Sequence, residues 1–221
     1  MFDNKMREDF LWYSYFGITK TDAKQSSEKK FYKAFEKCSD RAYLDMCRTI
    51  RFTQSSSSLK GKELENYIKK KSEYKKGVKE KLFKLILSIS KNTKLEQFYN
   101  EAFDIIISAS ENRTDLFDKP LTYGQAQKWV NMTIKNMLVM GLWELPENIE
   151  NQLHIPIDSY IMDEAKTELN IQKMGSSWSK ISNINEYFDY QTKIQEAVEA
   201  TYPPLVWEHY AWIKHANKTA E

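Results

Sequence analysis

The chain has 221 residues, and its 33 Lys and Arg against 31 Asp and Glu leave a formal net charge of +2. Six glycines and five prolines are about 5% of the chain where roughly 12% is usual, which argues against an all-β sandwich, a propeller or a glycine-rich nucleotide-binding fold. A hydrophobic share of 41% and a charged share of 29% fit a globular protein rather than a disordered one.

The sequence predicts a cytoplasmic protein that has no membrane span, metal or cofactor. No window of about 18 apolar residues occurs, and residues 1–16 lack the cleavage site of a signal peptide. Cys38 and Cys47 fall in one predicted helix, about 13.5 Å apart, which is too far for a disulfide. The scattered histidines predict no metal site: His154, His209 and His215.

The first part of the chain predicts two helices and a loop. Residues 7–17 hold five aromatic side chains at helical spacing, which is more typical of a core than of a stacking platform. Residues 28–52 form an amphipathic pattern, with apolar side chains at steps of three and four: Phe31, Phe35, Cys38, Ala42 and Met46. Residues 53–61 are polar and predict a loop.

A long charged helix is predicted over residues 62–90. Between Lys60 and Lys84 the sequence has ten lysines and four glutamates, a local charge of +6. Such a run is usually a solvated helix face, and the alternative is a surface that binds phosphates. Only the apolar residues 82–89 of this helix are expected to be buried.

The second part of the chain predicts five more helices, at about 94–109, 123–140, 159–169, 184–200 and 204–216. Prolines and polar turns separate them, and no segment alternates with the period of a strand. We therefore expect an all-α fold of about eight helices in a single domain, residues 1–221.

Two residues of this second part could carry chemistry. Helix 123–140 has an apolar stripe, and Lys128, Asn131 and Lys135 lie on its polar side. Lys128 lies within the first two turns, near the positive end of the helix dipole, which favours the neutral amine over the ammonium. Asp158 directly precedes a predicted helix and can cap it. Taken singly, such residues are usually a solvated lysine and a simple N-cap.

The order of these residues resembles the helix-hairpin-helix DNA glycosylase superfamily. In that family a hairpin leads into a helix with an early nucleophilic lysine, and a later segment delivers an aspartate that caps the next helix. Here G-Q-A-Q-Lys128-W-V-N and H-I-P-I-Asp158-S-Y-I match this order over residues 115–170. Asp158 follows Lys128 at a spacing of 30 positions, a longer connector than in most members and one similar to that of the archaeal 8-oxoguanine DNA glycosylase branch. The hairpin has Gly124, but Ala126 stands where a second glycine is usual.

The resemblance implies two interleaved helical lobes with a cleft that binds double-stranded DNA carrying a flipped base. It implies a DNA glycosylase and AP lyase that excises a damaged or modified base, with an 8-oxoguanine-type purine as the first expectation. Lys128 is then the nucleophile that forms a Schiff base, and Asp158 stabilises positive charge on the sugar. The implied base contacts are Gln127, Gln191 and Trp207, and the implied DNA-backbone contacts are Gly124, Gln125 and Lys135.

Two other functions remain open at the level of sequence. One is a helical DNA-binding protein without catalysis, and the other is a helical interaction protein of a defence or regulatory system. The Lys128–Asp158 pair discriminates between them, because only an enzyme of this kind needs both side chains in one cleft.

Overall fold

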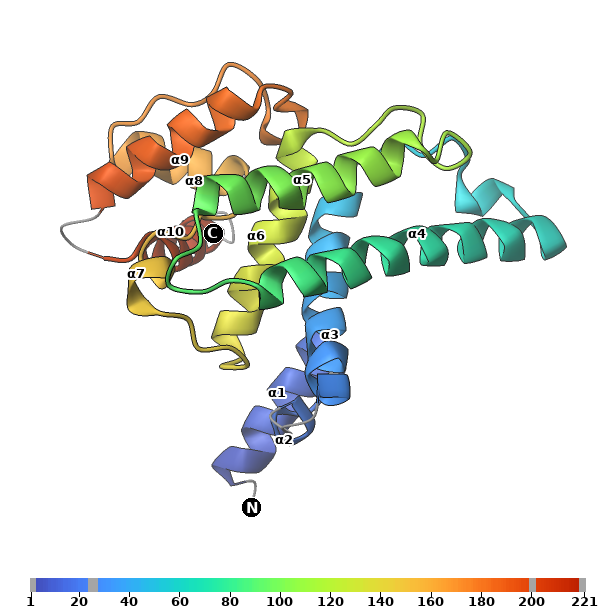
Figure 1. Ribbon diagram of the computed structural model, residues 1–221, viewed down its shortest axis with the longest axis horizontal. Helices are drawn as coiled ribbons and strands as arrows, with labels where there is room; N and C mark the ends of the chain where they lie inside the picture. Colours follow the sequence, from blue (N-terminus) through green and yellow to red (C-terminus); the bar gives the residue numbers. More distant parts are fainter. Residues whose placement is uncertain (1–2, 24–27, 199–201, 219–221) are drawn as a thin grey trace.

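The computed structural model describes residues 3–23, 28–198 and 202–218 and is all-helical, as predicted (Figure 1). Over these residues the α-helices are α1 (Asn4–Phe16), α2 (Lys20–Ala23), α3 (Glu28–Cys47), α4 (Gly61–Leu87), α5 (Leu95–Glu111), α6 (Tyr123–Val139), α7 (Glu147–Glu150), α8 (Ser159–Glu168), α9 (Ile184–Val198) and α10 (Pro204–Lys218). Two 3-10 turns, Ser56–Ser58 and Trp178–Lys180, complete the described elements. The sequence predicted about eight helices, and the two additional ones are the single-turn helices α2 and α7.

The predicted helix over residues 28–52 is too long. Helix α3 ends at Cys47, because the backbone beyond it pairs with a distant segment instead. Phe52 and Phe117 form an isolated antiparallel bridge, in which Thr53 donates to the carbonyl of Leu116 (3.0 Å) and Asp118 donates to the carbonyl of Arg51 (3.0 Å). These bonds fasten the start of the 53–61 loop to the chain that enters α6.

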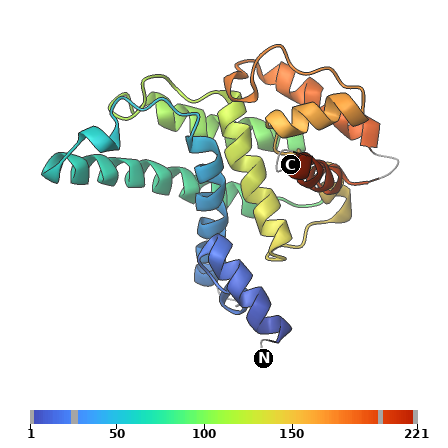
Figure 2. The same ribbon diagram turned by 180° about the vertical axis from the view of Figure 1, so that it is seen from behind.

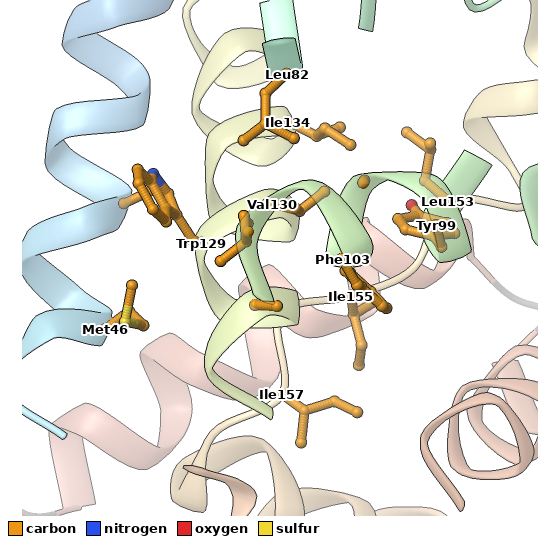
Figure 3. Close-up of a cluster of buried hydrophobic side chains, with 14 of the residues drawn as sticks. Met46, Leu82, Tyr99, Phe103, Trp129, Val130, Ile134, Leu153, Ile155 and Ile157 are labelled. Carbon is orange, nitrogen blue, oxygen red and sulfur yellow. The ribbon is translucent and has the colours of Figure 1, made fainter. Parts of the chain in front are cut away.

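Helix α6 runs through the middle of the molecule, with α3 on one side and α10 on the other (Figures 1 and 2). Its apolar stripe packs into the main core, where Trp129, Val130 and Ile134 are fully buried. Figure 3 shows this core, to which α3, α4 and α5 contribute Met46, Leu82, Tyr99 and Phe103.

The polar side of α6 is also covered, contrary to the expectation that it is solvated. Lys128 and Asn131 are buried, and Lys135 is half-buried. The chain between α7 and α8 and the helix α10 lie against this side (Figure 2). Polar residues on a helix that is covered all round must find partners inside the protein, and those partners define the site described below.

The start of α6 is closely packed. Thr122 caps it and forms a capping box with Gln125. A Cβ atom at Gly124 would lie 1.7 Å from the carbonyl oxygen of Trp178, so a side chain here is incompatible with the present course of the 3-10 turn. Glycine is therefore required at this position for packing.

Many lysines of α4 have acidic or aromatic partners. Lys79 pairs with Glu36 and Asp40, and Lys70 pairs with Asp115. The ammonium of Lys71 lies 3.5 Å from the centroid of the Phe52 ring. This distribution fits a salt-bridged helix face, because part of the local positive charge is neutralised within the fold. The expectation that only residues 82–89 are buried is wrong, since Tyr67, Tyr74, Val78 and Lys79 are buried as well. Among the described helices, none combines the length and apolar character needed to cross a membrane.

Candidate active site

Lys128 and Asp158 meet in an ion pair. The Nζ atom of Lys128 lies 2.7 Å from Oδ2 of Asp158, and the two side chains are only 7% and 15% exposed. The second carboxylate oxygen, Oδ1, accepts a hydrogen bond from the backbone N–H of Ile161 (3.0 Å). Asp158 therefore caps α8 with one oxygen and binds the lysine with the other. The pair joins segments 30 residues apart in the sequence.

The pair lies in the wall of a cavity of about 520 Å³, here named the Lys–Asp cavity. That volume falls within the range of small-molecule sites. Side chains from α1, α3, α6 and α10, together with Asp158, form its walls. The lining residues are Leu11, Trp12, Tyr15, Phe16, Arg41, Asp45, Arg48, Lys128, Met132, Lys135, Asn136, Val139, Asp158, Glu208, His209, Trp212 and Ile213.

A second ion pair lies in the same cavity, between Lys135 and Glu208. Glu208 is fully buried, and burial raises the pKa of its carboxyl group, although the neighbouring Lys135 acts in the opposite direction. Its Oε1 atom has no hydrogen-bond partner among the residues that the structure describes. A buried acceptor without a partner is costly, and this one lies out of contact with solvent beside the Lys135 ion pair.

Two glutamines hold the connector that ends at Asp158. Nε2 of Gln127 donates to the carbonyl of Ile157 (2.8 Å), and the N–H of Ile157 donates back to Oε1 of Gln127 (3.1 Å). Gln191 binds the backbone of Ile155 in the same two-way manner (3.1 and 2.8 Å). Both glutamines are buried and lie outside the cavity lining. Their amide groups are bonded to the connector backbone, so in this structure they are not free to contact a base.

Aromatic residues hold the connector at His154, four residues before Asp158. His154 stacks on Tyr99, with ring centroids 3.9 Å apart, and its Nδ1 atom lies 2.9 Å from the hydroxyl of Tyr187. Burial lowers the pKa of His154 to about 3, so its ring is neutral at physiological pH. Asn131 also reaches this cluster and donates to the carbonyl of Ile155 (2.9 Å). Buried hydrogen bonds thus position the last residues of the connector, 154–157.

The structure does not offer Gly124 and Gln125 to a DNA backbone. The N–H of Gly124 donates to the carbonyl of Ile181 (3.2 Å), and the N–H of Gln125 donates to Oγ1 of Thr122 (3.1 Å). The side chain of Gln125 binds Thr49. These groups are already bonded within the protein, so in this structure they are not free for the phosphate contacts that the resemblance implies. Lys135 likewise faces Glu208 in the cavity rather than the outer surface.

Trp207, the implied base contact on α10, does not line the cavity. It is buried outside the cavity lining, where its Nε1 atom donates to Oε2 of Glu168 (3.1 Å). Trp212 lies five residues further along α10, about 140° around the helix, and lines the cavity instead. The position of the tryptophan relative to the cavity depends on how α10 packs, which sequence reasoning did not resolve.

Sequence reasoning missed the contribution of α1 to this cavity. The spacing of its aromatic residues favours a core position, but α1 has no buried residue, and Leu11, Trp12, Tyr15 and Phe16 line the cavity. Among the residues described, no group of three His, Cys, Asp or Glu side chains could hold a metal ion.

No protein-family model, curated protein or solved structure matches the chain. The chemistry of the site therefore follows from its own geometry. Lys128 pairs with Asp158, Lys135 pairs with Glu208, whose Oε1 atom has no partner among the described residues, and aromatic side chains line the same cavity.

Proposed function

We propose that this protein is a DNA glycosylase and AP lyase that acts in the cytoplasm on a damaged or modified base in double-stranded DNA. The observation that carries the proposal is the Lys128–Asp158 pair at 2.7 Å in the wall of a cavity of about 520 Å³. Lys128 is buried rather than solvated, and Asp158 binds it in addition to capping α8. An enzyme that uses the amine as a nucleophile requires this arrangement.

In the proposed reaction the target base leaves the DNA stack and enters the Lys–Asp cavity. Lys128 transfers one proton of its ammonium group to the departing base, and the amine formed in this way attacks the sugar C1′ as the glycosidic bond breaks. Asp158 stays ionised and stabilises the positive charge that develops on the sugar. Opening of the sugar ring then gives a Schiff base between Nζ and C1′. Loss of the proton at C2′ expels the 3′ phosphate and nicks the strand.

The other cavity residues support a purine with both donor and acceptor groups on its edge. Lys135 is a donor, and Oε1 of Glu208 is an acceptor without a partner in the described structure. An 8-oxoguanine-type base suits this pair, because oxidation turns the N7 acceptor of guanine into an N–H donor. Stacking on Trp12 or Trp212, which both line the cavity, contributes about 1–3 kcal/mol per base.

Borohydride trapping tests the proposal directly. Duplex oligonucleotides, each carrying one lesion or an abasic site, are incubated with the protein and sodium borohydride, which reduces a Schiff base to a stable adduct. We expect an adduct with the wild type, no adduct with Lys128→Gln, and an unchanged adduct with Lys84→Gln, an exposed lysine of α4. The lesion that traps most strongly identifies the substrate.

Two outcomes favour the alternative functions. Salt-sensitive DNA binding with neither adduct nor base release indicates a DNA-binding protein without catalysis. The absence of both binding and adduct indicates an interaction protein, for which the structure offers the exposed apolar side chains of α1: Met6, Phe10, Leu11 and Tyr13.

A further inference from the structure

One wall of the Lys–Asp cavity presents two arginines. Arg41 and Arg48 both line the cavity. Arg41 lies in the last two turns of α3, and Arg48 lies in the turn that directly follows Cys47, the last residue of that helix. Neither belongs to the Lys128–Asp158 or the Lys135–Glu208 pair.

The charges of the cavity are balanced everywhere except at this wall. Lys128 and Lys135 each have an acidic partner within the cavity, Asp158 and Glu208 respectively. The lining has one further carboxylate, that of Asp45, for the two arginines. Its contact with Arg41 is loose, at 3.9 Å. The wall formed by Arg41, Asp45 and Arg48 therefore carries an excess of positive charge.

Arg41 is held in place but not fully satisfied. Its guanidinium carbon lies 4.3 Å from the centroid of the Tyr15 ring, an arrangement that fixes the plane of the group. Its Nε atom is buried and has no acceptor among the described residues. Arg48 is exposed, and no ion pair joins it to the described part of the chain. A guanidinium stacked on an aromatic ring is suited to a planar, bidentate anion contact through its other N–H groups.

We propose that Arg41 and Arg48 form a phosphodiester-binding site, which holds the backbone of the nucleotide whose base occupies the Lys–Asp cavity. This inference rests on the proposed function, because it assumes that a nucleotide enters there. A base inside the cavity leaves its flanking phosphates at the opening, and arginine binds phosphate oxygens through two parallel hydrogen bonds. The site replaces the hairpin amides, since the N–H groups of Gly124 and Gln125 are already bonded within the protein.

The test compares Arg48→Gln and Arg41→Gln with Arg51→Gln, which removes an exposed arginine outside the cavity lining. Affinity is measured by fluorescence anisotropy, over a series of salt concentrations, for two duplexes. One contains a tetrahydrofuran abasic analogue, which cannot form a Schiff base, and the other is undamaged. Arg48 is exposed, so its replacement leaves the fold intact even if the Arg41 variant loses its packing against Tyr15.

We expect Arg48→Gln to weaken binding of the abasic duplex about tenfold and to reduce the salt slope by about 1. Binding of the undamaged duplex changes less than about threefold, because its phosphates stay outside the opening. Equal effects of Arg48→Gln, Arg41→Gln and Arg51→Gln on both duplexes would overturn the inference alone, provided the wild type binds DNA and forms the borohydride adduct. A wild type that binds neither duplex overturns both this inference and the proposed function.

Discussion

Gln127 and Ile157 exchange two hydrogen bonds, of 2.8 and 3.1 Å, one residue before Lys128 and Asp158 respectively. The glutamine side chain thus pairs with the N–H and C=O of one connector residue, as a neighbouring β-strand would. Because the paired residues are adjacent in both segments, this contact sets the register in which the amine and the carboxylate meet. The site depends on a buried amide as much as on its two charged groups.

Replacing Gln127 by Met removes both bonds but keeps the volume of the side chain. We expect the trapping rate of the variant to fall about tenfold or more, while its affinity for DNA stays within about twofold of the wild type. The free energy of unfolding falls by about 2–4 kcal/mol, since the N–H and C=O of Ile157 lose their partner. Gln97→Met on the exposed side of α5 is the control, and a variant of Gln127 that traps at the wild-type rate contradicts the register argument.

Asp158 has two roles that two substitutions can separate. Asp158→Asn keeps an oxygen for the N–H of Ile161 but removes the charge beside Lys128, so base release slows by about 100-fold or more. Asp158→Ala also loses the cap, which costs about 1 kcal/mol of additional stability. Single-turnover base release and urea unfolding of both variants measure the two effects. If the Asn variant releases base as fast as the wild type, the carboxylate has no role in the reaction.

His154 makes the stability of the connector depend on pH. Because the pKa of His154 is lowered from 6.5 to about 3 by burial, the unfolded chain binds a proton below pH 6.5 that the folded chain refuses. Its contribution is constant above that pH and is lost progressively between pH 6.5 and 3, by about 1.4 kcal/mol per pH unit. Urea unfolding of the wild type and His154→Phe at pH 7 and pH 4.5 checks this. The wild type should lose about 2–3 kcal/mol more than the variant, and parallel losses would disprove it.

Two glycines make opposite predictions for the same substitution. Gly124→Ala brings a methyl group within 1.7 Å of the carbonyl oxygen of Trp178, so the 3-10 turn must move, and stability falls by about 3 kcal/mol or more. Gly77 lies inside α4, and no neighbouring atom of the described chain lies within 4 Å of the place that an added Cβ would take. Gly77→Ala therefore raises stability by about 0.5–1 kcal/mol. Thermal unfolding of the two variants compares them, and a neutral Gly124→Ala would refute the close packing at the start of α6.

Much of the fold follows from local patterns in the sequence. The steps of three and four along α3, the prolines at the start of α10 and the capping aspartate before α8 predict helices at nearly the observed places. The exceptions have tertiary causes. Residues 48–52 leave the helix because Phe52 pairs with Phe117, and no pattern within residues 28–52 contains that partner.

The order of residues along the chain predicts the Lys128–Asp158 pair. It does not by itself predict that the two side chains meet in one cavity. The sequence by itself determined an all-helical chain, a lysine early in α6 and a capping aspartate before α8. Only the tertiary structure decided that Gln127 and Gln191 serve the connector, that Trp212 rather than Trp207 faces the cavity, and that α1 and α3 complete its wall. The physical reason is that helix periodicity specifies which residues share a face, whereas the packing of distant segments decides what each face meets.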